Sequence, residues 1–320
     1  MGKKFSGASQ LLSRFRGWIQ AGAALLTNLH LPNFLKGGLY QGAGKNVCVP
    51  GLNCYSCPAA SGACPIGAFQ AVVGSSKFSF SYYITGFLIL LGVLLGRFIC
   101  GFLCPFGWFQ ELLHKIPTKK LSTKRLKPLT YLKYAVLLVM VFLLPAFLVN
   151  DVGMGDPFFC KYLCPQGVLE GAIPLSLANS GIRAALGSLF TWKFCILLAV
   201  SVLSVVFYRP FCKWLCPLGA FYALFNRVSL FQIKVDKNKC VSCGKCAKAC
   251  KMDVDVTKTP NHAECIRCGM CVRACPTSAV SFRYGFGDGK DKTKAAAMPQ
   301  KNNDLSLIHI SEPTRRTPIS

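Results

Sequence analysis

Eight cysteines near the C-terminal end of the chain constrain its fold more than any other feature. They form two groups, and in each group three cysteines are separated by two residues while the fourth follows after three more. The groups are Cys240, Cys243, Cys246 and Cys250, then Cys265, Cys268, Cys271 and Cys275. Each iron of a cubane cluster needs one thiolate, and ligands at this spacing cover only one side of a cluster. The segment is therefore predicted to fold around two iron–sulfur clusters.

This spacing resembles the bacterial ferredoxin with two [4Fe-4S] clusters, in which the fourth cysteine of each repeat binds the cluster of the other repeat. The resemblance implies one cluster on Cys240, Cys243, Cys246 and Cys275, and a second on Cys265, Cys268, Cys271 and Cys250. Structural zinc and disulfides are the alternatives, but zinc prefers two pairs of cysteines and a reducing compartment disfavours disulfides. Four nearby basic residues are expected to be solvated surface charge rather than groups that stabilise reduced clusters or dock an acidic partner: Lys245, Lys248, Arg267 and Arg273.

The composition points to a membrane protein. Of the 320 residues, 52% are hydrophobic and 15% charged, although the net charge is +25. A basic nucleic-acid-binding tail would be poor in apolar residues, so no nucleic acid partner is expected. Four runs have the length of a membrane span: Trp18–Leu35, Phe80–Ile99, Tyr131–Val149 and Leu189–Tyr208. The first run carries Gln20, Asn28 and His30, so an interfacial or soluble amphipathic helix is its alternative.

The distribution of Lys and Arg predicts an orientation. Positive charges precede the first run and follow the second, which places both segments in the cytoplasm, whereas the connection between the third and fourth runs belongs outside. The predicted fold is an all-α polytopic membrane domain with four spans at 1–228, then a small α+β ferredoxin domain at 229–288. We expect a multi-pass protein of the cytoplasmic membrane with both termini and the ferredoxin domain in the cytoplasm. The polar tail at 289–320 resembles sequencing-adapter read-through from about 305 and is left out of the fold prediction.

A second cysteine pattern lies within the apolar part. Four Cys-Pro-x-Gly motifs begin at Cys64, Cys104, Cys164 and Cys216, and three of them have another cysteine four residues earlier, at Cys100, Cys160 and Cys212. The motifs alternate between the predicted outer and inner ends of the spans. We therefore interpret the membrane domain as a tandem two-span repeat related by a pseudo-twofold axis along the membrane normal.

This arrangement predicts one or two further clusters. The predicted inner ends contribute Cys100, Cys104, Cys212 and Cys216, which suit an iron–sulfur cluster or a structural metal. The alternative is a helix-terminating motif whose cysteines are small buried hydrophobes. Outside, Cys48 and Cys54 accompany the set chosen as cluster ligands, which is Cys57, Cys64, Cys160 and Cys164. Disulfides compete at this outer site because the outside is oxidising.

The combination of motifs resembles the membrane quinol dehydrogenase subunit of periplasmic nitrate reductase and its iron–sulfur relatives in nitrous-oxide regulation and oxidase assembly. The marks are Cys100-Gly-Phe-Leu-Cys104-Pro105, Cys212-Lys-Trp-Leu-Cys216-Pro217 and the eight ferredoxin cysteines. The resemblance covers about Arg14 to Tyr284 and implies electron transfer between the quinol pool or a cytoplasmic donor and an extracytoplasmic acceptor. The outer cysteines depart from the nitrate-reductase subunit and leave the acceptor open.

A quinone is a further expected cofactor, and the quinol pool or redox proteins are the expected partners. Quinone sites have no firm motif, so the candidates are only polar and aromatic residues of the first run and of the segment after Cys104: Gln20, His30, Trp108, Gln110, Glu111 and His114. An assembly factor that supplies electrons to another enzyme, or reduces its metal, is the alternative function. A purely structural metal-binding module is the third.

Overall fold

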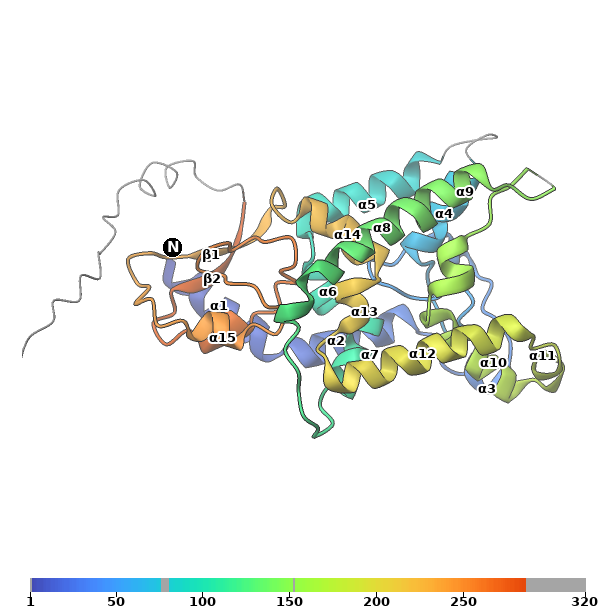
Figure 1. Cartoon of the computed structure of the whole chain (residues 1–320), viewed down its shortest axis with the longest axis horizontal. Coiled ribbons are helices and arrows are strands. Elements are labelled where there is room, and N and C mark those ends of the chain that lie inside the picture. Colours follow the sequence, from blue (N-terminus) through green and yellow to red (C-terminus); the bar gives the residue numbers. More distant parts are fainter. Residues whose placement is uncertain (1, 76–80, 152, 286–320) are drawn as a thin grey trace, which may run out of the picture. The chain divides into compact units, whose positions relative to one another are not determined.

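The structure is a computed structural model that describes residues 2–75, 81–151 and 153–285, so the predicted tail at 289–320 lies outside the described residues. The chain is mostly helical (Figure 1). Its N-terminal helices are α1 (Gly2–Arg14), α2 (Arg16–Thr27), α3 (Asn33–Lys36), η1 (Ala43–Asn46), α4 (Pro65–Gly74), α5 (Tyr82–Leu95), α6 (Phe98–Phe102) and α7 (Pro105–Leu113). The central helices are η2 (Lys124–Tyr131), α8 (Leu132–Val136), η3 (Leu137–Leu143), α9 (Leu144–Phe147), η4 (Phe159–Leu163), η5 (Gly167–Ala172), α10 (Ile173–Ala178), α11 (Ser180–Ala184) and α12 (Ser188–Val206). The last are α13 (Pro210–Trp214), α14 (Pro217–Phe225), α15 (Lys245–Ala249) and α16 (Met270–Ala274).

The C-terminal region has the small α+β fold predicted for a ferredoxin. Strands β1 (Phe231–Val235) and β2 (Val280–Tyr284) pair antiparallel, and the short helices α15 and α16 lie between them in the sequence (Figure 1). Ile233, Val280 and Phe282 alternate with less buried neighbours and form the core of this region with cysteine side chains. Helix α1 packs against β2 and α16, and the Ser9 hydroxyl accepts the Phe282 amide at 3.1 Å. The N-terminal helix thus covers the ferredoxin-like region.

The predicted four-span tandem repeat is wrong. In the described residues, two helical segments are long and apolar enough to cross a membrane, Lys124–Phe147 and Ser188–Val206, close to the third and fourth predicted runs. Within the predicted span Phe80–Ile99, helix α5 has 14 residues, about 21 Å at 1.5 Å per residue, which is shorter than the hydrocarbon core. It ends because Gly96 adopts φ +54°; residue 80 itself lies outside the described residues.

The first predicted span, Trp18–Leu35, is not one continuous helix either. Helix α2 stops at Thr27, whose carbonyl accepts the Ser61 amide, while the His30 amide donates to the Ala59 carbonyl. The Asn28 side chain turns back to the Ala24 carbonyl at 3.1 Å, and Pro32 follows. A helix cannot continue once these groups are engaged by the 59–61 segment. The polar residues in this run indicated the break.

Three of the four Cys-Pro-x-Gly motifs start a new helix at their proline. Cys64, Cys104 and Cys216 are extended residues that precede α4, α7 and α14, and a proline occupies the first helical position in each case. Proline fits there because the first amides of a helix have no partner within the helix. The free amides point back at the motif: the Gly219 amide donates to the Cys216 sulfur at 3.4 Å. The motifs therefore place cysteine sulfurs at helix N-termini, inside the protein.

Candidate iron–sulfur sites

The ferredoxin-like region brings together the cysteines that the sequence grouped for its second cluster. Cys250, Cys265, Cys268 and Cys271 line one small cavity, whose other walls are apolar side chains. Cys250 comes from the first repeat and the other three from the second, as the crossover pattern predicts. In the first group, burial raises the pKa of Cys246, and the nearby thiols of Cys275 and Cys240 raise it further. Cys243 lies exposed.

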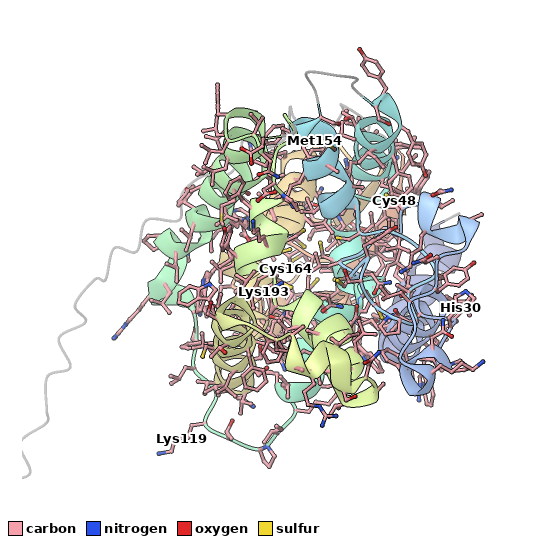
Figure 2. All side chains as sticks on the ribbon, turned by 90° about the vertical axis from the view of Figure 1, so that its right-hand side faces the viewer. His30, Cys48, Lys119, Met154, Cys164 and Lys193 are labelled. Atoms are coloured by element: carbon pink, nitrogen blue, oxygen red, sulfur yellow. The ribbon has the colours of Figure 1, made fainter. Side chains whose placement is uncertain are left out.

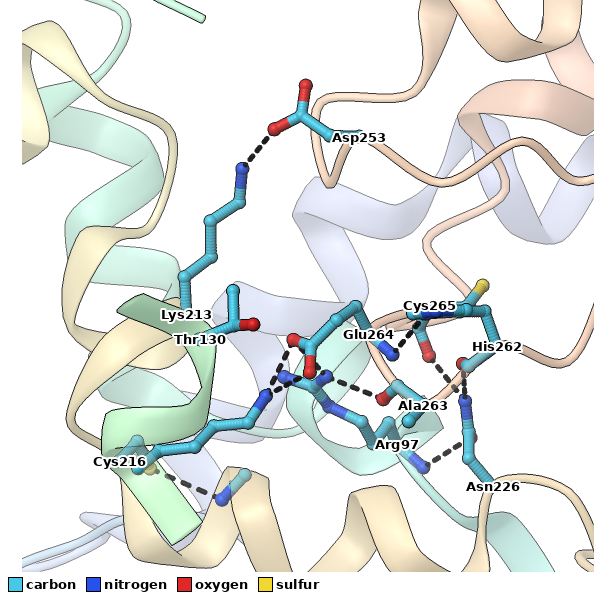
Figure 3. Close-up of polar contacts among 12 residues, drawn as sticks. Arg97, Thr130, Lys213, Cys216, Asn226, Asp253, His262, Ala263, Glu264 and Cys265 are labelled. Carbon is cyan, nitrogen blue, oxygen red and sulfur yellow. Dashed lines mark hydrogen bonds and ion pairs between the residues drawn. The ribbon is translucent and has the colours of Figure 1, made fainter. Parts of the chain in front are cut away.

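The loop that carries Cys265 and Cys268 is anchored on the helical part by buried side chains (Figure 3). Asn226 donates to the carbonyls of His262 and Cys265 at 2.6 and 3.0 Å and accepts the Arg97 amide at 3.2 Å. Glu264 forms ion pairs with Arg97 and Lys133, at 3.0 and 2.5 Å.

Arg267 anchors the same loop from within. It is fully buried and donates to the carbonyls of Leu95 and Asn226 and to the Ser229 hydroxyl, at 2.8, 2.6 and 2.7 Å. The expectation that Arg267 is solvated surface charge is therefore wrong. The ferredoxin-like region is joined to the helical part by polar contacts on both sides of Cys265.

Four cysteines from two motifs gather beside this loop, in what we term the Cys100 site: Cys100, Cys104, Cys212 and Cys216. All four are buried, and each interacts electrostatically with at least one other member. Burial raises the pKa of Cys100 and Cys212, whereas Arg97 and Arg209 lower it. The side chain of Gln110 donates to the Cys212 sulfur at 3.2 Å. The sequence grouped these four thiols, and the fold brings them together.

Two fully buried arginines flank the Cys100 site. Arg97 and Arg209 each lie three residues before the first cysteine of a motif, and neither side chain is exposed to solvent. Arg97 pairs with Glu264, and Arg209 pairs with Glu111 while donating to the Cys100 carbonyl. The Nη2 atoms of both guanidinium groups nonetheless have no hydrogen-bond partner. Two buried cations with spare donors beside these thiols favour an anionic group at the site.

A second set of cysteines surrounds a cavity of about 520 Å³, which we term the Cys64 cavity. Its sulfur-bearing residues are Cys48, Cys54, Cys64, Cys160 and Cys164. Figure 2 shows Cys164 and Lys193 in the middle of the view, with His30 at the edge. Lys193 donates to the Cys160 carbonyl at 3.0 Å, and Gln70 donates to the Cys160 sulfur at 3.2 Å. Three of the four cysteines predicted for the outer site thus meet here.

Cys57, the fourth predicted ligand, does not line this cavity in the described structure. Its thiol is fully buried among Ala59, Ala60 and Phe34, and it donates to the Asn28 side chain at 3.5 Å. Cys54 occupies the cavity wall in its place. All 19 cysteines lie in the described part of the chain and are free thiols, so the structure contains none of the disulfides considered for the outer set.

The Cys64 cavity and the Cys100 site are neighbours. Consecutive residues of one loop reach both: a Cβ at Gly51 would lie 2.9 Å from Cys104 Cα, and the backbone amides of Leu52 and Asn53 partly offset the effect of burial, which raises the pKa of Cys104 and Cys64. Tyr222, fully buried, interacts electrostatically with thiols of both sets and donates to the Pro50 carbonyl at 3.1 Å. One stretch of chain therefore contacts both groups of cysteines.

Comparisons with known proteins match both cysteine patterns to iron–sulfur proteins. A 4Fe-4S binding domain profile matches residues 62–82, 79–124, 133–173 and 189–238, and another matches 233–254 and 259–281. The uncharacterized protein MJ0750 of Methanocaldococcus jannaschii is 32% identical over 209 residues, 62% of this chain and 77% of that protein. The chain belongs to the ferredoxin-type iron–sulfur electron-transport family.

Two further relatives of this family carry descriptive names. The methylamine utilization ferredoxin-type protein MauN of Paracoccus denitrificans is 27% identical over 188 residues, 58% of this chain and 56% of that protein. The ferredoxin-type protein NapH of Haemophilus influenzae is 26% identical over 152 residues, 35% of this chain and 53% of that protein. No solved structure matches the chain. The resemblance inferred from the motifs is confirmed, and the chain is an iron–sulfur electron-transport protein.

The Cys100 site fits the cofactor of the ferredoxin-type family. Its spare guanidinium donors complement a negatively charged cluster. Gly107 leaves room for one of these guanidinium groups, because a Cβ there would lie 2.8 Å from Arg209 Nη1. In the described residues no three His, Cys, Asp or Glu side chains converge on a point where one metal ion would bind.

The sequence analysis did not predict the polar partners of the cysteines, although glutamine and arginine recur at fixed positions relative to the motif cysteines. Cys64 and Cys104 each have a glutamine six residues later, Gln70 and Gln110, and Cys100 and Cys212 each have an arginine three residues earlier.

The residues predicted as quinone candidates do not all lie together in the structure. Gln20, Trp108 and Glu111 line one cavity with Cys268, whereas Gln110 holds Cys212, His114 bonds the Ser204 carbonyl and His30 stacks on Tyr40.

Proposed function

We propose that this protein carries electrons through a membrane by way of several iron–sulfur centres, between the quinol pool or a cytoplasmic donor and an extracytoplasmic acceptor. The ferredoxin cysteines would hold two [4Fe-4S] clusters, one on Cys240, Cys243, Cys246 and Cys275 and one on Cys265, Cys268, Cys271 and Cys250. The Cys100 site would hold a further cluster. When bound, such clusters supply one-electron oxidation and reduction.

The single observation that carries the proposal is the direct contact between the ferredoxin-like region and the Cys100 site. Gly101 lies between Cys100 and Cys104, and a Cβ at this position would collide with the Ile266 carbonyl. Met252, Val254 and Ile266 share one apolar core with Cys100, Cys104 and Cys216. A buried, apolar contact of this kind excludes water and keeps the two groups of thiols at a fixed separation.

A cavity next to Cys268 supports quinone as the small electron carrier. It has a volume of about 140 Å³ and is bordered by Arg16, Gln20, Trp108 and Glu111, among others. Polar donors beside an aromatic ring suit a quinone head group, which is flat and carries two carbonyl oxygens. Glu111 is held ionised there, because the adjacent Arg209 and Arg16 outweigh the effect of burial and lower its pKa to about 2. This side chain would accept hydrogen bonds from neighbours rather than exchange a proton near neutral pH.

Membrane localisation rests on the two apolar helices, Lys124–Phe147 and Ser188–Val206. The proposed cytoplasmic side is the one with the ferredoxin-like region, because positive charges gather before and at the start of the first of these helices: Lys115, Lys119, Lys120, Lys124 and Arg125. Protease or thiol-reagent access from each side of sealed membrane vesicles would test this orientation. Cleavage of the ferredoxin-like region only in vesicles with the cytoplasmic face exposed is the expected result.

Quinol-driven reduction of the clusters tests the function. A reduced quinone added to membranes that contain the protein should produce the electron paramagnetic resonance (EPR) signals of reduced clusters without another protein. Trp108→Leu should slow this reduction several-fold. His30→Ala should leave it unchanged, because His30 does not line the cavity and stacks on Tyr40 with the ring centroids 3.7 Å apart. Reduction that occurs only when a partner protein is added would favour the alternative, an assembly factor that supplies electrons to another enzyme.

A further inference from the structure

We propose that the Cys64 cavity holds a cluster on Cys54, Cys64, Cys160 and Cys164, with Cys54 rather than Cys57 as the fourth ligand. This inference rests on the proposed electron-transfer function and deepens it. It also extends the set of centres beyond the Cys100 site, which is adjacent through Leu52 and Asn53.

The contacts of Cys54 repeat those of Cys160. Gln70, six residues after Cys64, accepts the amide of Phe159 at 2.9 Å, next to Cys160. Glu170, six residues after Cys164, accepts the amide of Cys54 itself at 3.2 Å. Each motif thus uses the same position of its helix to hold a cysteine that belongs to another segment.

The glycines of the two motifs repeat the relationship. A Cβ at Gly67 would lie 3.7 Å from the Cys160 sulfur, and a Cβ at Gly167 would lie 3.6 Å from the Cys54 sulfur. Each sulfur therefore rests against the start of the helix that follows the other motif.

The first motif lacks the usual earlier cysteine, because Ala60 stands four residues before Cys64. Cys54 supplies the missing thiol from an earlier part of the loop. In the other motif of this cavity the earlier cysteine is Cys160, so Cys54 and Cys160 play equivalent parts in the two halves of the site.

Donors to sulfur complete the site. Burial raises the pKa of Cys54, Cys64 and Cys164, but nearby backbone amides lower it: that of Ser56 at Cys54, those of Asn53, Ile66 and Gly67 at Cys64, and those of Gln166 and Gly167 at Cys164. The Cys160 sulfur accepts from Gln70 Nε2 at 3.2 Å. Hydrogen bonds of this kind stabilise the charge of cluster thiolates and help to set the reduction potential. Lys193 Nζ, which would lie 3.4 Å from a Cβ at Gly167, adds a positive charge to the same wall.

Neither remaining cysteine of this segment is placed as well. Cys57 lies outside the cavity wall, and its thiol donates to the Asn28 side chain. Cys48 also lines the cavity, but among the described interactions Cys64 is the one proposed ligand thiol with which it interacts electrostatically, whereas Cys54 interacts with Cys64, Cys160 and Cys164. Cys48, Cys54 and Cys57 therefore form a matched series for mutagenesis.

The experiment is iron and acid-labile sulfide quantification on anaerobically purified full-length protein, with EPR spectra of the dithionite-reduced samples. Cys54→Ala should lower the iron content by about four atoms per chain, because a cubane cluster holds four. Cys57→Ala and Cys48→Ala should keep the parent content. The EPR signals of the ferredoxin clusters should persist in all three variants and show that each has folded.

An unchanged iron content in Cys54→Ala, or a loss in Cys57→Ala or Cys48→Ala instead, would overturn the assignment. If Cys54→Ala does not accumulate, Cys54→Ser supplies an oxygen ligand in its place and should alter the EPR line shape of one cluster; an unaltered spectrum would also overturn it. Iron content does not depend on quinol. A failed assignment therefore leaves the proposed function standing, whereas clusters that are present but never reduced by quinol contradict only that function.

Discussion

Gln70 and Gln110 make the same pair of contacts at two different cysteines. Each donates from Nε2 to a cysteine sulfur at 3.2 Å, Gln70 to Cys160 and Gln110 to Cys212. Each also accepts, through Oε1, the amide of the residue just before that cysteine, at 2.9 and 3.2 Å. Both side chains are fully buried. One amide group therefore fixes a cysteine's backbone and its sulfur together.

Gln110→Leu should lower both the stability of the protein and the reduction potential of a cluster at the Cys100 site. The substitution leaves the buried Phe211 amide without its acceptor, which costs about 1–3 kcal/mol. It also removes an N–H donor from the Cys212 sulfur, and loss of such a donor makes reduction less favourable. Thermal unfolding and an EPR-monitored redox titration measure the two effects.

Gln232→Leu is the matched control for that change. Gln232 lies in β1 and donates only to the Ser229 carbonyl, at 2.9 Å, among its described contacts. Its replacement should leave the potential unchanged. If Gln110→Leu keeps the reduction potential of the parent, the contact of Gln110 with Cys212 stabilises the fold but does not affect the potential of the cluster.

Glu111 should make the protein sensitive to acid. Arg16 and the Tyr208 hydroxyl donate to its carboxylate, and Arg209 pairs with it at 2.9 Å. Its folded pKa of about 2 lies below the ordinary value of 4.5, so its stabilising effect is complete above about pH 4.5 and is lost as the pH falls toward 2. Glu111→Gln should be less stable than the parent at neutral pH and should lose less stability on acidification.

A pH series of thermal midpoints measures this effect. Glu111→Leu should cost about 3–5 kcal/mol at neutral pH, because it leaves buried arginines without their anion. Asp236→Asn is the control, since its pair with Lys239 at 3.5 Å is exposed and should contribute little. Parallel pH profiles for Glu111→Gln and the parent would contradict the prediction.

Arg267→Met should weaken the attachment of the ferredoxin-like region. The variant keeps most of the side-chain volume but loses three hydrogen bonds, to Leu95, Asn226 and Ser229. We expect a loss of about 2–4 kcal/mol, measured by thermal unfolding. Arg273→Met, at an exposed position of α16, should change stability by less than about 0.5 kcal/mol. Equal effects of the two variants would mean that the buried contacts of Arg267 carry no net stabilisation.

The cysteine groups could be predicted from the sequence because their spacing is set by the cofactor. The ferredoxin grouping, including the place of Cys250 beside Cys268, agrees with the cavity that the fold forms. The structure also brings Cys100, Cys104, Cys212 and Cys216 together, which the sequence grouped through a four-span repeat that is wrong; Cys104 and Cys216 precede helices, whereas Cys100 and Cys212 lie within α6 and α13. Short-range spacing was sufficient for the ferredoxin cysteines, whereas the other four come from motifs more than one hundred residues apart.

The membrane topology failed because apolar runs do not determine where a helix ends. Thr27 and Gly96 end α2 and α5 through contacts with distant segments and through a positive φ angle. The burial of Arg267 could not be predicted for the same reason. The residues around it in the sequence do not indicate that Asn226 and Ser229 accept its hydrogen bonds. The choice between Cys54 and Cys57 also required the structure. Glu170, which accepts the Cys54 amide, is more than one hundred residues away from Cys54 in the sequence.

Gly101→Ala should disturb the contact between the Cys100 site and the ferredoxin-like region. A Cβ at this position would collide with the Ile266 carbonyl, a backbone atom that cannot move aside like the end of a flexible side chain. Since backbone must shift to admit the methyl group, we expect a loss of about 1–3 kcal/mol and slower electron transfer between the two sites. Gly86→Ala is the control: this glycine is also helical, no heavy atom lies within 4 Å of the place that its methyl group would take, and the change should be neutral or slightly stabilising.

Both variants are compared by thermal unfolding and by rapid-mixing measurement of how fast each EPR signal appears after reductant is added. In Gly101→Ala the signals of the ferredoxin clusters should still appear at the parental rate, because none of their cysteines is altered. The signal of the Cys100 site should appear later than in the parent, and in Gly86→Ala it should not. A delay of equal size in both variants would contradict the prediction. It would mean that electron transfer does not depend on the contact at Ile266, because both variants add one methyl group but only Gly101 lies against Ile266.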